Sequence, residues 1–118
     1  MFEISVQGSF SAAHQVKGYK GDCADMHGHT YKVEIKIRIE ELDKLGMAMD
    51  FRKVKLVLKK ILSELDHKNL NNLPFFKRRN ATAEWVAVYI YQHMKEKIKK
   101  IKSVTVWEGY ENSVTYSE

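Results

Sequence analysis

The chain has 118 residues, of which 44% are hydrophobic and 30% are charged. This length fits one domain with its own core and is too short for two, so we expect a single domain over residues 1–118. The single cysteine excludes an internal disulfide. No apolar segment approaches membrane-spanning length. No signal peptide opens the sequence, so we expect a cytoplasmic protein.

The formal net charge is +5 and the pI is about 9.3. Such a charge favours an anionic partner, either a phosphorylated small molecule or nucleic acid. Lysines near the end of one predicted helix contribute much of the excess positive charge. A solvated helix face, with cations beside the helix C-terminus, explains them without any ligand and is the simpler interpretation. They are Lys95, Lys97, Lys99, Lys100 and Lys102.

Two strands are predicted in the first third of the chain. Residues 2–13 begin with alternating apolar and polar side chains, which indicates a half-buried strand that Gly8 could interrupt. Residues 15–28 contain three glycines and few apolar side chains, so they predict a loop. Residues 30–40 alternate most clearly and predict an antiparallel strand with one buried and one charged face.

Two helices and a hairpin follow. Asp50 can cap a helix that runs to about Leu65, and residues 66–79 form a loop with the only proline. Thr82 can cap a second helix over residues 83–101. Two short strands joined by Gly109, Tyr110 and Glu111 then predict a hairpin, at residues 103–108 and 112–117.

The predicted order is therefore β-β-α-α-β-β. Both helices have an apolar stripe that needs a surface to cover, and the sheet offers one face. We expect an α+β fold in which an antiparallel four-stranded sheet carries both helices on one face. The exposed sheet edges must be covered or paired, so oligomers formed by sheet extension are expected.

Three histidines and the cysteine lie within sixteen residues: His14, Cys23, His27 and His29. His27 and His29 project to the same side of an extended chain. If the first two strands pair as a hairpin, His14 lies across from both. Three imidazoles with one open position suit catalytic zinc, although copper, iron and nickel accept the same ligands. The alternative is loop histidines that face solvent.

The cysteine and two acidic positions have several interpretations. Cys23 could be a fourth metal ligand, a base or nucleophile with a pKa lowered by the nearby cation, or a small buried apolar residue. Asp66 could orient His67 and raise its basicity, although a histidine that complements a helix C-terminus is the simpler interpretation from the sequence alone. Glu108 at a strand end could bind an amidine-like edge, or be an ordinary surface glutamate.

Taken together, these motifs resemble the 6-pyruvoyl-tetrahydropterin synthase family over nearly the whole chain. The Cys-x3-His-Gly-His spacing resembles the branch that makes 6-carboxy-5,6,7,8-tetrahydropterin. The matching segments are Phe10–His14, Cys23–His29, Met49–Phe51, Leu65–Asn71, Thr82–Glu84 and Glu108.

The resemblance implies a T-fold (tunnelling fold) domain and a homohexamer of two trimers with sites at subunit interfaces. It implies a zinc cofactor and a pterin triphosphate substrate, with neither a nucleic acid nor a membrane as partner. It also implies a role for each candidate residue: His14, His27 and His29 bind zinc, Cys23, Asp66 and His67 transfer protons, and Glu108 anchors the pterin ring.

The implied reaction converts 7,8-dihydroneopterin triphosphate to 6-carboxy-5,6,7,8-tetrahydropterin, acetaldehyde and triphosphate, as in queuosine or archaeosine biosynthesis. The nearest alternative is 6-pyruvoyl-tetrahydropterin formation from the same substrate, without cleavage of the carbon–carbon bond. A more remote alternative is a non-catalytic RNA-binding domain, in which Cys23 completes a structural zinc site with the three histidines.

Overall fold

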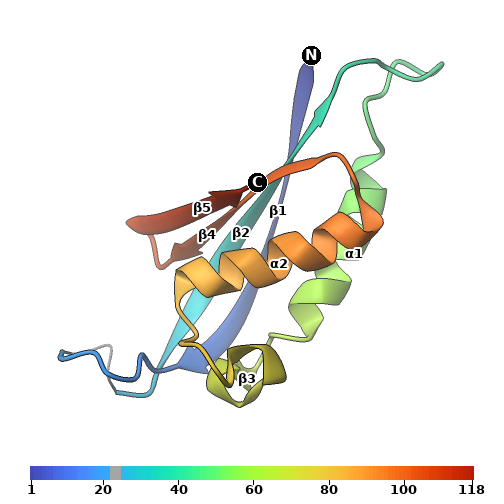
Figure 1. Cartoon of the computed structure of the whole chain (residues 1–118). Coiled ribbons are helices and arrows are strands. Elements are labelled where there is room, and N and C mark those ends of the chain that lie inside the picture. The colour runs from blue at the N-terminus through green and yellow to red at the C-terminus, as the bar shows by residue number, and fades with distance from the viewer. Residues whose placement is uncertain (22–24) are drawn as a thin grey trace.

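Two long antiparallel strands form the centre of the molecule (Figure 1). The computed structural model describes residues 1–21 and 25–118. Strand β1 pairs with β2 along its whole length, from Phe2 opposite Ile39 to His14 opposite His27. The elements in chain order are β1 (Phe2–His14), β2 (His27–Ile39), α1 (Phe51–Ser63), β3 (Lys68–Asn69), the 3-10 turns η2 (Leu70–Asn72) and η3 (Pro74–Phe76), α2 (Ala83–Lys97), β4 (Ile101–Glu108) and β5 (Asn112–Ser117).

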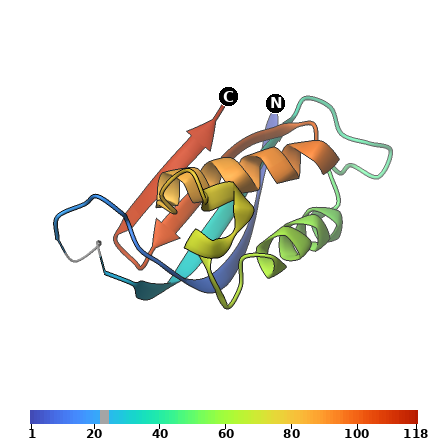
Figure 2. The ribbon, with the colours of Figure 1, turned by 60° about the horizontal axis from the view of Figure 1, so that its bottom comes forward.

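The strand order in the sheet is β3-β1-β2-β4-β5, and every pairing is antiparallel except that of β3 with β1. Both helices cover the same face of this sheet (Figures 1 and 2). The predicted α+β fold is confirmed, with five strands instead of four. The additional strand, β3, has only two residues, which is too short to produce an alternating pattern.

The core lies between the sheet and the helices. Tyr31, Val33, Ile35 and Ile37 on β2 are fully buried, and their neighbours in sequence point to the polar face. Apolar side chains of both helices cover them, because each helix presents a stripe with helical spacing. The stripe residues buried here are Val54, Leu58, Ile61 and Leu62 on α1 and Val86, Ala87, Ile90 and Met94 on α2.

Both helices begin where their caps predict. The Asp50 carboxylate accepts the backbone N–H of Arg52 at 2.9 Å, and the Thr82 hydroxyl accepts that of Trp85 at 3.2 Å. Helix α2 ends at Lys97, four residues before the predicted end. Ile98 and Ile101 continue the apolar spacing, but Ile101 already belongs to β4 and pairs with Ile37.

Strand β1 continues through Gly8 without interruption, contrary to the possibility raised by its sequence. Gly8 instead makes room for helix α1. A Cβ atom at this position would lie 3.0 Å from Leu62 Cδ1 and 3.2 Å from Leu58 Cδ2. The missing side chain therefore allows α1 to pack closely on β1.

We expect Gly8→Val to lower the free energy of unfolding by about 1–3 kcal/mol, because the added methyl groups overlap the leucines of α1. Urea denaturation measures the change. Ser9→Val, one residue along on the exposed polar face, is the matched control and should stay within about 0.5 kcal/mol of the natural chain. Equal stability of the two variants would contradict the close packing at Gly8.

The outer edge of β1 is paired with β3 only at Ala12 and Ala13, and β5 forms the other edge of the sheet. Within the described residues, most of the β1 edge has no strand beside it. None of the helices that the structure describes is long and apolar enough to cross a membrane.

Candidate metal centre

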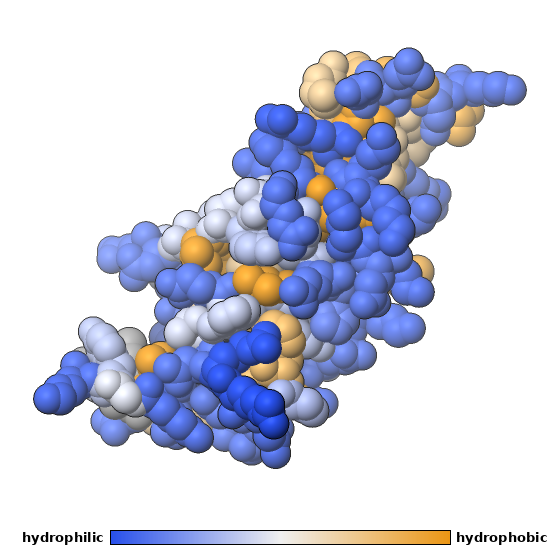
Figure 3. Space-filling model, viewed as in Figure 1, coloured by the Kyte–Doolittle hydropathy of each residue, from blue (hydrophilic) through white to orange (hydrophobic). Residues whose placement is uncertain are grey.

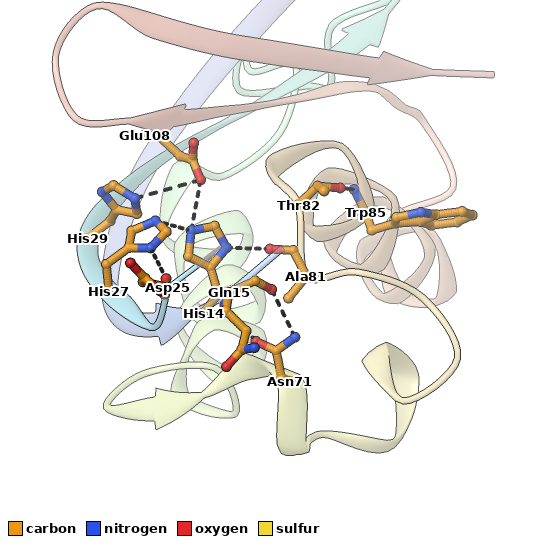
Figure 4. A network of polar contacts seen from close by, with 10 residues as sticks. All are labelled: His14, Gln15, Asp25, His27, His29, Asn71, Ala81, Thr82, Trp85 and Glu108. Atoms are coloured by element: carbon orange, nitrogen blue, oxygen red, sulfur yellow. Dashed lines mark hydrogen bonds and ion pairs between the residues drawn. The ribbon is translucent and has the colours of Figure 1, made fainter. Parts of the chain in front are cut away.

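Three imidazoles meet at the end of the β1–β2 pair (Figure 4). The antiparallel register places His14 opposite His27 and Ala12 opposite His29, so His27 and His29 flank His14 from the neighbouring strand. One ligand nitrogen from each ring lies within 4.8 Å of the others. The predicted hairpin and the predicted convergence of His14, His27 and His29 are both present.

Hydrogen bonds fix the tautomers of two of these rings. His14 Nδ1 lies 2.5 Å from the Ala81 carbonyl oxygen, and His27 Nδ1 lies 2.7 Å from that of Asp25. A carbonyl oxygen only accepts, so each Nδ1 carries the hydrogen and each Nε2 presents a lone pair. The two Nε2 atoms are 3.0 Å apart. Two facing lone pairs at this distance repel each other unless a proton or a metal ion lies between them.

Glu108 adds negative charge at the same point. Its Oε1 lies 3.3 Å from His14 Nε2 and 4.0 Å from His29 Nε2 (Figure 4). A carboxylate beside imidazole nitrogens is likewise stabilised by a proton or a metal ion at that point. The donor set therefore fits a divalent metal ion. Glu108 lies beside the imidazoles, and its predicted role in anchoring the pterin ring stays a prediction.

The third imidazole is also available as a ligand. Burial lowers the pKa of His29, which favours the neutral ring that a metal binds. The ring of Tyr31 packs edge-on against His14 and His29, with centroids 5.8 Å and 5.6 Å away. Tyr31 thus supports two of the three rings from the core side. Among the described residues, its hydroxyl is the one buried side-chain polar atom without a hydrogen-bond partner.

Two asparagines bind the backbone of the residues that follow His14. The sequence analysis did not predict this function. The Asn71 side chain accepts the N–H of Gln15 at 2.9 Å and donates to its carbonyl at 3.1 Å. Asn80 makes the same pair of bonds with Lys17, at 2.9 Å and 3.1 Å. Because Asn80 precedes Ala81, its bonds help to position the carbonyl that orients His14.

We expect Asn80→Ala to weaken metal binding by about tenfold. Loss of a group that positions a metal ligand typically costs about 10–100-fold in metal affinity, and Asn80 acts on His14 only through the neighbouring Ala81. A competition titration against a chromophoric chelator measures it. Asn72→Ala is the matched control: Asn72 is exposed, and no side-chain hydrogen bond of it occurs among the described residues. Unchanged affinity in Asn80→Ala, with the fold intact, would contradict a positioning role.

Asp66 and His67 anchor the segment after α1 to strand β1. Asp66 Oδ1 accepts the N–H of Ser11 at 2.9 Å, and the N–H of His67 donates to the Ser11 carbonyl at 2.6 Å. Asp66 Oδ2 lies 3.1 Å from His67 Nδ1. His67 has a φ of +59°, uncommon for a residue with a side chain, and its ring is 82% exposed.

The hydrogen bond from Ser11, aided by His67, lowers the pKa of Asp66. A depressed folded-state pKa means that the ionised carboxylate stabilises the fold above its unfolded pKa of about 3.9. This contribution is lost as the pH falls through the lower folded-state pKa. We expect the stability difference between the natural chain and Asp66→Asn to shrink below about pH 4. Urea unfolding between pH 3 and pH 7 tests this, and a difference independent of pH would contradict it.

Two hollows border the imidazole cluster. One, of about 630 Å³, is lined by both His29 and His67, so His67 faces the same space as a candidate metal ligand. The other, of about 300 Å³, is lined by His14, Glu108 and Glu84 among others. Cys23, the predicted proton-transfer residue, lies outside the described residues.

Comparisons with known proteins show which family the chain is similar to. The sequence profile named 6-pyruvoyl tetrahydropterin synthase matches residues 3–118. The chain is 36% identical to dihydroneopterin monophosphate aldolase of Pyrococcus furiosus over 114 residues, which cover 94% of this chain and 93% of that protein. It is 32% identical to 6-carboxy-5,6,7,8-tetrahydropterin synthase of Haemophilus influenzae over 142 aligned positions, covering all of both chains.

The structure of Caenorhabditis elegans 6-pyruvoyl tetrahydropterin synthase superposes with a TM-score of 0.89 at 30% identity. The superposition covers 99% of this chain and 95% of that one, and confirms the predicted T-fold. The profile match and the superposition cover nearly the whole chain. The chain belongs to the 6-pyruvoyl tetrahydropterin synthase family.

Proposed function

We propose that this chain is a zinc-dependent lyase that converts 7,8-dihydroneopterin triphosphate to 6-carboxy-5,6,7,8-tetrahydropterin, acetaldehyde and triphosphate. The main support is the pair of bare Nε2 atoms of His14 and His27, 3.0 Å apart. A partly buried arrangement of this kind is favourable when a metal ion occupies it. The similarity to the Haemophilus influenzae synthase supports the choice of product.

His14, His27 and His29 would hold the zinc ion and leave one coordination position open. Three neutral nitrogen ligands are typical of catalytic zinc sites. Zinc bound there would supply Lewis acidity to oxygen atoms of the substrate side chain. The Ala81 and Asp25 carbonyls keep the His14 and His27 rings in the tautomer that such binding needs.

The remaining candidate residues would move protons and hold the pterin. Asp66 holds His67 through Nδ1, which leaves Nε2 free to exchange a proton in the hollow that His67 shares with His29. Cys23 would remove the proton from the side-chain carbon, a function that suits a thiolate near a cation. The Glu108 carboxylate would accept N–H groups from the edge of the pterin ring.

The overall reaction balances without an external oxidant or reductant. Loss of triphosphate and internal proton transfers oxidise the side chain while they reduce the dihydropterin ring. Addition of one water and cleavage of the bond between the first two side-chain carbons then gives the carboxylate and acetaldehyde. The chain's own residues need only relay protons and exclude other reactions.

Incubation of zinc-loaded protein with 7,8-dihydroneopterin triphosphate, followed by mass analysis, tests this proposal. A carboxypterin together with acetaldehyde is the expected result. Unchanged substrate would refute the proposal. Zinc-free protein prepared with a chelator is the control and should be inactive until zinc is restored.

Two other activities belong in the same assay. A pyruvoyl pterin would indicate the reaction named for the Caenorhabditis elegans relative, which is 33% identical over 124 residues. The similarity to the Pyrococcus furiosus aldolase favours dihydroneopterin monophosphate as a second substrate to test. Consumption of the monophosphate, with the triphosphate untouched, would assign the chain to that activity.

We also propose that the protein works as a hexamer of two trimers in the cytoplasm, in queuosine or archaeosine biosynthesis. The largely unpaired edge of β1 in the described part of the chain supports assembly through the sheets. Light scattering tests the oligomer number, and transfer-RNA nucleoside analysis of a deletion strain tests the pathway.

A further inference from the structure

A second cluster of charge lies beside the metal centre, in the segment that leads into α2. A pocket of about 320 Å³ is surrounded by four cationic side chains, and no acidic side chain lines it. Figure 3 shows the most hydrophilic side chains of this face gathered over the same segment. The lining residues are Lys17, Asn71, Phe76, Lys77, Arg78, Arg79 and Asn80.

Hydrogen bonds and burial fix the walls of this basic pocket. The Asn71 and Asn80 side chains use both of their polar atoms on the backbone of Gln15 and Lys17. Phe76 is 2% exposed and anchors the turn that carries the cations. The amides thus serve as a rigid frame, and the charged groups are the part of the pocket that can bind a ligand.

Acidic side chains in the described part of the chain do not neutralise these cations. Among the ion pairs that the structure describes, none involves Lys17, Lys77, Arg78 or Arg79. The lysine cluster after α2 differs, because Lys102 there pairs with Glu3 at 2.9 Å. Adjacent cations without partners repel one another, and an anion bound among them removes that repulsion.

Arg79 is also held in place. Its guanidinium carbon lies 4.2 Å from the ring centroid of Phe75 and 4.6 Å from that of Trp85. Stacking on aromatic faces restricts the planar group and leaves its N–H edge for a ligand. A guanidinium matches phosphate with two parallel hydrogen bonds, so the pocket is better suited to phosphate than to a simple halide.

The pocket is close to the metal centre. Lys17 is three residues after His14, a separation of at most about 11 Å along extended chain. Asn80 is next to Ala81, whose carbonyl binds His14. These two connections place the pocket next to the residues that hold His14.

We propose that the basic pocket binds the oligophosphate end of the substrate and selects a triphosphate over a monophosphate. This inference deepens the proposed function and rests on it for the identity of the anion. Four cations can share the charges of three linked phosphates, whereas a single phosphate reaches only some of them. Affinity should therefore rise from phosphate to pyrophosphate to tripolyphosphate.

Isothermal titration of the full chain with these three inorganic anions tests the proposal. The protein is treated with a chelator first, because tripolyphosphate binds zinc. The double variant Lys77→Ala/Arg78→Ala should lose at least about tenfold in tripolyphosphate affinity. The matched control Lys99→Ala/Lys100→Ala removes two exposed charges beyond the far end of α2 and should lose less than about twofold.

Three results would overturn the inference: no saturable binding of tripolyphosphate, equal losses in both double variants, or equal affinity for phosphate and tripolyphosphate. Tight binding of single-stranded RNA with a steep salt dependence, lost in the same double variant, would assign the pocket to nucleic acid instead. The outcome is independent of the activity assay. If the protein makes carboxypterin but does not bind tripolyphosphate, only the proposed role of the pocket is refuted. If it binds tripolyphosphate but makes no carboxypterin, only the proposed reaction is refuted.

Discussion

Replacing His14 with alanine is expected to abolish metal binding and turnover together. The His14 side chain is almost completely buried, and its Nε2 faces both His27 and Glu108. Loss of an outer partner of a metal ligand costs about 10–100-fold in affinity, so loss of a ligand itself should cost at least about 100-fold. The zinc content should fall from one ion per chain to almost none, as measured by elemental analysis after dialysis.

The same substitution should remove the stabilisation that metal provides. With zinc at about 100 times its Kd, binding adds about 2.7 kcal/mol to the free energy of unfolding. Adding a chelator should therefore lower the Tm of the natural chain and leave the Tm of His14→Ala unchanged. Differential scanning calorimetry with and without chelator measures both.

Two further variants separate metal loss from unfolding. His29→Ala removes a candidate ligand whose side chain is 29% exposed, so it should lose zinc with a smaller effect on the fold. His93→Ala removes a histidine on α2 that donates Nδ1–H to the Tyr89 carbonyl, and it should retain zinc. Full zinc content in both His14→Ala and His29→Ala would exclude the three-imidazole site.

Regular alternation explains why most of the fold could be predicted. A strand with one buried and one solvated face has a period of two, and residues 30–40 show it for eleven positions. The errors arise where that signal is ambiguous. Ile98 and Ile101 follow Met94 at helical spacing, yet the chain turns after Lys97 so that Ile101 can pair with Ile37 on β2. Only the tertiary pairing determines where this helix ends.

The imidazole cluster could be predicted because it depends on parity and pairing alone. Once β1 and β2 form a hairpin, the positions of His14, His27 and His29 follow from strand geometry. The asparagine contacts could not be predicted in this way. Asn71 and Asn80 bind backbone atoms 56 and 63 residues away in the sequence, and no local pattern indicates which backbone a surface asparagine will contact.

Cys23→Ala is expected to leave zinc binding intact while kcat falls by about 10²–10⁴-fold, the usual contribution of a positioned acid or base. If the three imidazoles form the ligand set of a catalytic site, the thiol is not required as a ligand and can transfer protons. Zinc content and turnover are measured on the same sample. Loss of zinc along with activity would instead make Cys23 a fourth ligand of a structural site.

A double variant shows whether Cys23 and the Asp66–His67 pair act in one proton relay. His67→Gln alone should lower kcat by a similar factor, because Asp66 then has no basic group to orient. Groups that act as a unit are strongly non-additive. Cys23→Ala/His67→Gln should therefore be no slower than the slower single variant. If the two effects multiply, each residue serves a separate step, and the exposed His67 would have to act independently of the thiol.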